Sequence, residues 1–130
     1  MDESGNINPD DYQLGQALID REHAELIRLI NALKNETLSS GEVLRRLQTY
    51  VQEHFEGEEE LMLLSAYPEA DEHFSQHREF SRHLAGFAIQ IHEAPQTMPE
   101  VRHFLEQWLL HHIQVTDRRL VDFLLHEEWL

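Results

Sequence analysis

Apolar residues recur at spacings of three and four along four stretches of the chain. This period places them on one face of a helix, so the pattern predicts four amphipathic helices and an all-α fold. The alternation of apolar and polar residues that is typical of strands does not occur. The positions predicted to face inward are Ile19, His23, Leu26, Ile30 and Leu33; Leu44, Leu47, Val51, His54, Glu58 and Leu61; His73, His77, Phe80, Leu84, Phe87 and Ile91; and Val101, Leu105, Trp108, His112 and Val115.

Short breaks separate these stretches at residues 35–41, 65–68 and 94–99, and each break contains glycine or proline. Long helices joined by short connections favour an antiparallel up-down-up-down four-helix bundle. With 130 residues, the chain suits a single domain that spans residues 1–130.

The beginnings of two helices carry specific signals. Asn8 followed by Pro9 suits a helix N-terminus, whereas Gly15 favours a later beginning that would leave an N-terminal arm. Ser39 or Ser40 is expected to cap the second helix.

A fifth amphipathic stretch lies at the C-terminal end, over residues 120–130. It predicts a short C-terminal helix. We expect this helix to pack Leu120, Phe123 and Leu124 against the end of the bundle.

Six of the inward positions are polar: His23, His54, Glu58, His73, His77 and His112. Burying a neutral polar group without a partner costs roughly 2–7 kcal/mol, and burying an unpaired charge costs more. At about 1.5 Å of rise per residue, their distances from the turns place all six in one layer of the bundle roughly 13 Å thick. Metal ions would satisfy such a layer, because each ion takes several nitrogen and oxygen ligands at once.

Asp117 joins this set only under a condition. It follows His112 by five residues, about 500° of ideal helical rotation, so a regular helix would point it elsewhere. A π-bulge or a frayed last turn would bring it to the site. Arg118 and Arg119, directly after it, suit a helix C-terminus, where cations are favoured.

Ordinary structural interpretations compete with the metal site. A single buried histidine is commonly a satisfied core residue, and a chain with ten histidines produces pairs four residues apart by chance. His54 and Glu58 fit a surface pair, and the acidic run 58–60 fits a solvated face, although only Glu58 of that run lies on an apolar stripe. Histidines from all four helices at one height favour a metal site. The other histidines are expected to be solvated, with His111 as an alternative to His112: His83, His92, His103, His111 and His126.

Charge and composition disfavour several other functions. The 10 Lys and Arg against 25 Asp and Glu give a formal charge of −15, which disfavours nucleic acid and anionic membranes as partners. No apolar run is long enough to cross a membrane, and the N-terminus lacks the segments of a secretory signal, so we expect a cytoplasmic protein. The chain has no cysteine, which excludes disulfides, zinc fingers and iron–sulfur clusters.

The seven candidate ligands are five imidazoles and two carboxylates, too many for one ion. They suit two ions bridged by the carboxylates, although nitrogen and oxygen donors do not distinguish iron from manganese, zinc or copper. Ferritin-like di-iron bundles use Glu-x-x-His motifs on two helices. Here only Glu100 and His103 have that spacing, away from the predicted layer, so that family is disfavoured.

The ordered set of motifs over about residues 12–120 resembles the hemerythrin family, and within it the single-domain bacterial hemerythrins (bacteriohemerythrins). One difference is Tyr12, where the bacterial members often carry tryptophan. The matching segments are Leu14-Gly15 with Ile19-Asp20-x-x-His23; His54-Phe55-x-x-Glu58-Glu59-x-x-Met62; Tyr67-Pro68 ahead of His73-x-x-x-His77; and Trp108-Leu109-x-x-His112-Ile113-x-x-x-Asp117.

The resemblance implies a non-haem di-iron centre that binds dioxygen reversibly, for storage, delivery or sensing, without being an enzyme in the strict sense. An oxo or hydroxo group would complete the bridge between the ions, and the iron with fewer histidines would keep an open position for dioxygen. An oxygen-consuming enzyme or a signalling protein would be the partner. The implied ligands are His73, His77 and His112 on one iron, His23 and His54 on the other, and Glu58 and Asp117 as bridges.

Reversible binding needs a dry pocket, because a proton donor beside the bound dioxygen would leave the iron oxidised. Four apolar residues hold positions suited to lining it, although core packing also explains them: Leu26, Phe55, Trp108 and Leu109.

Two other functions stay open. One is a di-iron enzyme that acts on peroxide or nitric oxide, or a protein of iron–sulfur repair, although such repair proteins usually carry an additional cysteine-bearing domain. The other is a structural bundle whose histidines bind metal adventitiously.

Overall fold

The structure, a computed structural model, describes residues 6–35 and 39–129. Over these residues it contains helices and no strand, so the predicted all-α class is confirmed. The elements are η1 (Pro9–Tyr12), α1 (Ala17–Asn35), α2 (Ser40–Ser65), α3 (Ala70–Glu93), η2 (Pro95–Thr97), α4 (Met98–His111), the π-helical segment η3 (His112–Asp117) and α5 (Arg118–His126).

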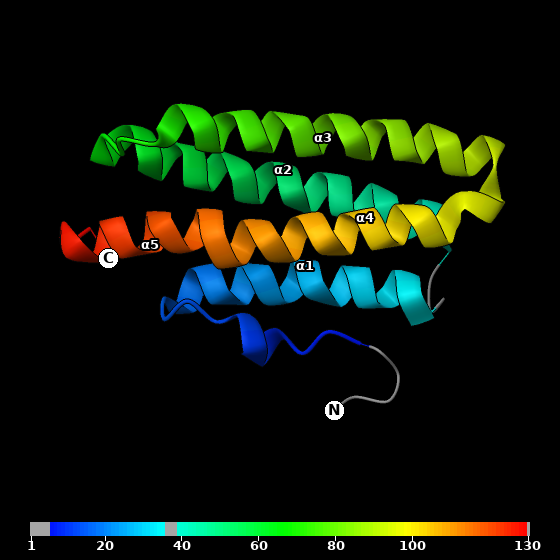
Figure 1. The fold of residues 1–130 in the computed structure, drawn as a ribbon, viewed down its shortest axis with the longest axis horizontal. Helices are drawn as coiled ribbons and strands as arrows, with labels where there is room; N and C mark the ends of the chain where they lie inside the picture. The colour runs from blue at the N-terminus through cyan, green and yellow to red at the C-terminus, as the bar shows by residue number, and fades with distance from the viewer. Residues whose placement is uncertain (1–5, 36–38, 130) are drawn as a thin grey trace.

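The long helices run alternately in opposite directions and form a bundle (Figure 1). α1 packs against α2 and α4, and α3 packs against the same two helices. This is the predicted antiparallel up-down-up-down arrangement. The chain reverses at the three predicted breaks, although residues 36–38 of the first break lie outside the described residues.

The predicted stripes form the core. All of their residues are buried except four, which are partly buried: Leu61, Phe87, Trp108 and Val115. Burial of apolar surface stabilises a bundle by about 25 cal/mol per Å², and here it surrounds the polar layer with packed side chains. The histidines and carboxylates of that layer are therefore held between four helices with little access to water.

The helix caps follow the predicted signals in part. The side chain of Ser39 caps α2 by accepting a hydrogen bond from the N–H of Glu42 at 3.3 Å. Asn8 does cap a helix, because its side chain accepts from the N–H of Asp10 at 3.0 Å. That helix is the short 3₁₀ turn η1, however, and α1 begins only after Gly15.

Gly15 and Asp20 form the joint between the N-terminal arm and α1. Gly15 has φ +93°, in the left-handed region that glycine adopts without strain. The carboxylate of Asp20 accepts hydrogen bonds from the N–H groups of Leu14 and Gly15, at 2.6 and 3.1 Å. Farther along the arm, Ile7 and Asn31 exchange two hydrogen bonds of 2.9 Å, which tie the arm to α1.

The fourth helix is longer than the sequence indicated, because α4, η3 and α5 form one continuous rod (Figure 1). The expectation that Arg118 and Arg119 end a helix is wrong, since these residues begin α5. The rod continues because α5 has an apolar face to bury at the end of the bundle. As predicted, Leu120 and Leu124 are buried there and Phe123 packs against them, in a cluster with Met62 and Tyr67.

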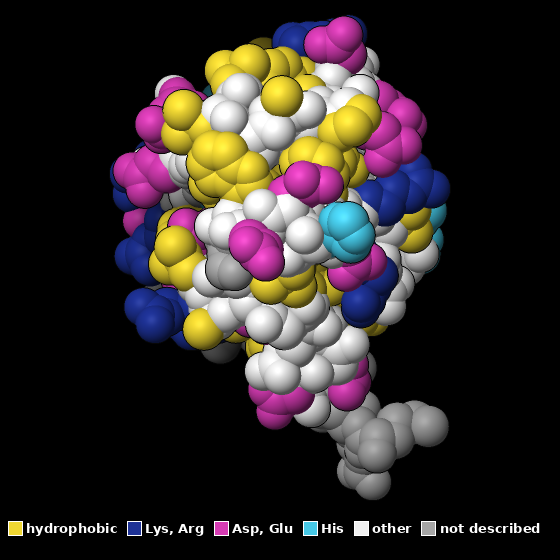
Figure 2. Space-filling model, turned by 90° about the vertical axis from the view of Figure 1, so that its left-hand side faces the viewer, with side chains coloured by type: hydrophobic (Ala, Val, Ile, Leu, Met, Phe, Trp, Pro, Cys, Tyr) yellow, Lys and Arg dark blue, Asp and Glu magenta, His cyan; other side chains and the backbone are white. Residues whose placement is uncertain are grey.

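No helix within the described residues is long and apolar enough to span a membrane. Figure 2 looks onto the end of the bundle where α1 begins and where α2 and α5 end; hydrophobic side chains gather there among acidic ones. The exposed large hydrophobic residues near these helix ends are Leu18, Leu63, Leu64, Leu125 and Trp129.

Candidate metal centre

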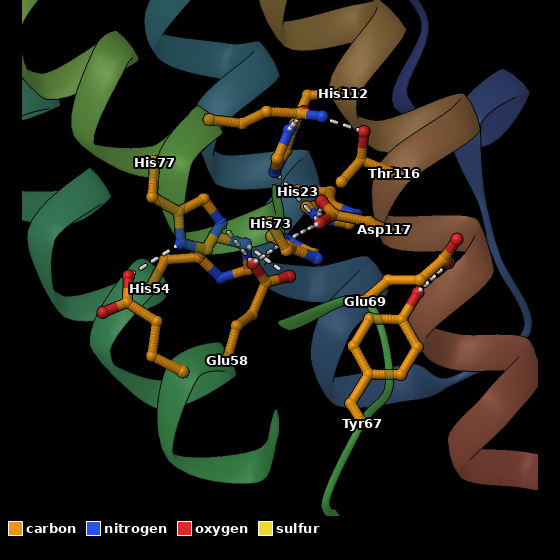
Figure 3. Close-up of polar contacts among 12 residues, drawn as sticks. His23, His54, Glu58, Tyr67, Glu69, His73, His77, His112, Thr116 and Asp117 are labelled. Atoms are coloured by element: carbon orange, nitrogen blue, oxygen red, sulfur yellow. Dashed lines mark hydrogen bonds and ion pairs between the residues drawn. The ribbon is translucent and has the colours of Figure 1, made fainter. Parts of the chain in front are cut away.

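The seven predicted ligands meet in the interior of the bundle (Figure 3). Each is buried, with no more than 3% of its surface exposed. On α2 and on α3 the two candidate ligands lie four residues apart, so both project from one face of their helix. The ligands come from three long helices and from the π-helical segment of the fourth rod: His23 from α1, His54 and Glu58 from α2, His73 and His77 from α3, and His112 and Asp117 from η3.

Asp117 reaches the site through the π-helical segment that its spacing required. The N–H of Arg118 bonds to the carbonyl of Ile113, five residues back, as in a π-turn. The extra residue in the turn brings Asp117 to the face that carries His112, whose Nε2 lies 3.2 Å from Asp117 Oδ1.

The ligand atoms form two groups that share both carboxylates. Within each group, the candidate atoms all lie within 4.8 Å of one another. The three-histidine group consists of His73, His77, His112, Glu58 and Asp117, and the two-histidine group of His23, His54, Glu58 and Asp117.

Glu58 divides its two oxygens between the groups. Oε1 lies 3.0 Å from Nε2 of His77 and 3.4 Å from Nε2 of His73. Oε2 lies 3.4 Å from Nε2 of His54, which belongs to the other group.

Asp117 divides its oxygens in the same way. Oδ1 lies 3.1 Å from Nε2 of His73 and 3.2 Å from Nε2 of His112, whereas Oδ2 lies 2.8 Å from Nε2 of His23. Each carboxylate therefore presents one oxygen to each group, which is how a carboxylate bridges two ions.

Most of these atoms lack hydrogen bonds. Eleven buried nitrogen and oxygen atoms of the seven residues make no hydrogen bond with the described residues, although the carboxylates form ion pairs with the histidines. They include all five Nε2 atoms and both oxygens of each carboxylate. Buried polar groups are nearly always satisfied, and leaving one unsatisfied costs about 1–3 kcal/mol, more if it is charged. The residues therefore fit a site that is completed by cations.

Three of the histidines are held by hydrogen bonds from their Nδ1 atoms. Such bonds fix the tautomer and orientation that leave Nε2 for a metal. Each acceptor lies one residue from a predicted ligand and bonds to a histidine of the next helix. The bonds run from His54 to Glu22, from His77 to Glu59 at 2.8 Å, and from His112 to Oε1 of Gln76 at 2.9 Å.

Sequence reasoning missed these three acceptors and assigned Glu59 to a solvated face. Glu22, Glu59 and Gln76 sit at the edges of the apolar stripes, where periodicity does not separate buried from exposed residues. Their signal in the sequence is adjacency, since each one neighbours His23, Glu58 or His77.

The close charges shift several pKa values. Burial lowers the pKa of His54, but Glu58 and Glu22 outweigh it and raise that pKa to about 10. Burial also opposes protonation of His73, but the adjacent carboxylates of Asp117 and Glu58 raise its pKa to about 9. For His112 burial prevails, and the pKa is lowered.

The carboxylates shift the other way. Burial raises the pKa of Glu58 and of Asp117, yet the surrounding histidines outweigh burial and hold both pKa values well below the usual range. Both carboxylates are therefore anionic at neutral pH and available to cations.

The remaining histidines lie away from this centre. His111 is exposed, so the alternative in which it replaces His112 is wrong. His92, His103 and His126 are exposed as expected, and Glu100 is exposed beside the start of α4. The expectation is only partly met at His83, which is half-buried; its ring lies 4.7 Å from that of Phe104.

Two of the predicted pocket residues contact the histidines. The ring of Phe55 stacks on His77 at 3.7 Å and 3°, and that of Trp108 stacks on His112 at 4.5 Å and 13°. Leu26 and Leu109 are buried in the same apolar cluster, and Trp108 packs against it. That the four residues line a ligand pocket stays a prediction.

Comparison with known proteins agrees with the site. A family model described as the hemerythrin HHE cation binding domain matches residues 14–124. Bacteriohemerythrin of Stenotrophomonas maltophilia is 30% identical over 118 residues, which cover 87% of this chain and 77% of that protein. Myohemerythrin of Theromyzon tessulatum is 30% identical over 115 residues (84% and 90%), and bacteriohemerythrin of Clostridium acetobutylicum is 27% identical over 124 residues (87% and 96%). No solved structure matches the chain significantly.

Proposed function

The chain belongs to the hemerythrin family, and from this premise we propose that it binds dioxygen reversibly at a carboxylate-bridged di-iron centre, for storage, delivery or sensing. One observation carries the proposal: two buried histidine groups share two carboxylates, each of which turns one oxygen to either group. A site for a single ion has no use for this division.

The chain's own residues supply the ligands. When bound, the iron pair supplies the two electrons that dioxygen takes up and returns. The lowered pKa values of Glu58 and Asp117 keep both carboxylates anionic, so neither brings a proton to the site. The irons would be held by His73, His77 and His112 on one side and by His23 and His54 on the other, with Glu58 and Asp117 available to both.

The two-histidine side would be the position for dioxygen. It offers one imidazole fewer than the other side, so an ion held there would have room for an exchangeable ligand. Leu26, Phe55, Trp108 and Leu109 exclude water from the centre, since apolar side chains offer neither a proton nor a hydrogen bond.

Anaerobic reduction followed by exposure to air tests the proposal. Protein loaded with ferrous iron should contain about two ions per chain. It should develop a visible absorption band in air and lose that band when oxygen is removed, over repeated cycles. Irreversible oxidation with turnover of peroxide or nitric oxide would instead make the protein an enzyme.

A matched pair of variants controls for the histidine content of the protein. His112→Ala removes a predicted ligand and should abolish the reversible band. His111→Ala removes its exposed neighbour and should leave the band unchanged. Equal behaviour of the two variants would contradict the assignment.

A further inference from the structure

The π-helical segment η3 is tied to α3 through one amide oxygen. Oε1 of Gln76 accepts two hydrogen bonds, from His112 Nδ1 at 2.9 Å and from Thr116 Oγ1 at 2.8 Å. His112 is the first residue of η3, and Thr116 is the last but one. Both ends of the segment are therefore held at a single point on the neighbouring helix.

The hydroxyl of Thr116 is used in an unusual way. A threonine inside a helix commonly bonds to the carbonyl four residues back in its own helix, as Thr49 does with Arg45 at 3.3 Å. Thr116 instead donates to Gln76 on α3, and not to a carbonyl of its own helix. Thr116 is 9% exposed and Gln76 is half-buried, so this hydrogen bond is partly shielded from water.

A π-turn needs such support, because it is rare and less favourable than the α-helix that the same residues can form. In the α-helical register, Asp117 would point about 140° away from the face of His112. Asp117 makes no hydrogen bond with the described residues, and its contacts in the centre are ion pairs with His23, His73 and His112, whose nitrogens metal binding would take over.

We propose that Gln76 and Thr116 are positioning residues that hold η3 in its π-helical register before metal binds, and so aim Asp117 into the centre. The inference rests on the proposed role of Asp117 as a bridging ligand. It concerns a property of the metal-free chain, however, which is measurable whether or not dioxygen binds.

Because α5 is packed against the end of the bundle, loss of the hydrogen bonds to Gln76 should have only a local effect on the structure. Leu120 and Leu124 are fully buried at the end of the bundle, so the rod beyond η3 resists rotation. Removal of the tie should therefore loosen the π-turn locally and leave both flanking helices in place.

Amide hydrogen exchange of the full-length, metal-free chain tests the inference. Thr116→Val keeps the shape of the side chain and removes its hydroxyl, and we expect exchange over residues 112–117 to become about tenfold faster. Residues 101–111 should be unchanged. Thr116→Ser restores the hydroxyl and should restore protection, whereas Thr49→Val, the same change at an ordinary helical threonine, should leave residues 112–117 unaffected.

Metal binding gives a second readout that mere packing would not reproduce. Thr116→Val should weaken ferrous iron binding about 10- to 100-fold, and Thr116→Ser should recover it. If Thr116→Val does not fold, Gln76→Asn, which withdraws the acceptor by one methylene, should give the same two results. Wild-type protection in Thr116→Val or in Gln76→Asn would overturn the inference. Loss of protection in a protein that binds no dioxygen would refute only the proposed function.

Discussion

The two histidine groups of the centre differ in the number of their donors and in how they are covered. The three-histidine group draws its imidazoles from α3 and η3, and the two-histidine group draws one each from α1 and α2. Each group contains one histidine backed by a carboxylate, Glu59 behind His77 and Glu22 behind His54. The three-histidine group has one further support, the amide of Gln76 behind His112. The sides therefore differ in the number of imidazoles and in the number of supporting hydrogen bonds.

Stacking of aromatic rings on the histidines adds to the difference between the two groups. Phe55 and Trp108 stack on His77 and His112, both in the three-histidine group. In the other group, the rings of His23 and His54 meet edge to face at 5.1 Å. Under the proposed function, this asymmetry would give one side a closed, structural role and the other side ligand exchange. The following changes test it.

Loss of a shared carboxylate should have the largest effect. Glu58→Ala removes one oxygen from each group at once, so iron content should fall from about two ions per chain to less than one. Elemental analysis after anaerobic loading measures this. Glu60→Ala, an exposed neighbour in the same acidic run, should keep both ions. Retention of two ions in Glu58→Ala would contradict a shared bridge.

Loss of one histidine should affect the groups unequally. His54→Ala leaves its group with a single imidazole, so that ion should be lost and about one ion per chain should remain. His77→Ala leaves two imidazoles in its group, and iron content should stay closer to two. Elemental analysis of both variants compares the groups directly, and equal losses would remove the asymmetry.

Substitution of the residues that accept hydrogen bonds from the histidine Nδ1 atoms should have smaller effects on metal binding, each confined to one group. Glu22→Gln and Glu59→Gln replace a charged acceptor by a neutral one, which should weaken metal binding about 10- to 100-fold at the group concerned. Competition with a chelator under anaerobic conditions gives the two affinities. If Glu22→Gln lowered the metal affinity of the three-histidine group as much as that of the two-histidine group, Glu22 and Glu59 would not act on separate groups.

A cavity near the centre should shorten the lifetime of the oxygenated form. Leu109→Ala would admit water, and the rate of irreversible oxidation should rise several-fold in stopped-flow measurements. Leu105→Ala, one turn earlier and equally buried, controls for the cost of a core cavity, about 2–5 kcal/mol. An unchanged rate in Leu109→Ala, or an equal rise in Leu105→Ala, would remove Leu109 from the pocket.

Proton release on metal loading is the smallest expected effect. The pKa values of His54 and His73, raised to about 10 and about 9, keep both protonated at pH 7 in the metal-free chain, and metal needs them neutral. Loading at pH 7 should release about two protons, as measured by calorimetry in buffers of different ionisation enthalpy. These raised pKa values stabilise the metal-free fold below about pH 6.5, and that contribution disappears as pH rises through 9–10. Loading without proton release would contradict this.

Local periodicity accounts for what the sequence predicted well. The stripes and the common height of His23, His54 and His77 depend only on the helical rise and on the turns, so the bundle and the layer could be predicted together. The predictions were incomplete where the chain departs from regular α-helical geometry or where a helix end depends on tertiary packing. The π-turn at Asp117 entered only as a condition, and Arg118 was placed at a helix end because a sequence does not show that α5 has a surface to bury against.

The side-chain support was not predictable for another reason. Whether Glu59 or Gln76 reaches a histidine depends on the rotation of one helix relative to the next, which the apolar stripe fixes only coarsely. His83 shows the same limit, because its half-buried position depends on Phe104 from another helix.

Anomalous diffraction at the iron edge, from crystals of the anaerobically loaded chain, tests the central claim most directly. Two peaks should appear, one beside Nε2 of His73, His77 and His112 and the other beside Nε2 of His23 and His54, with Glu58 and Asp117 reaching both. A single peak, or none in this layer, would contradict the account.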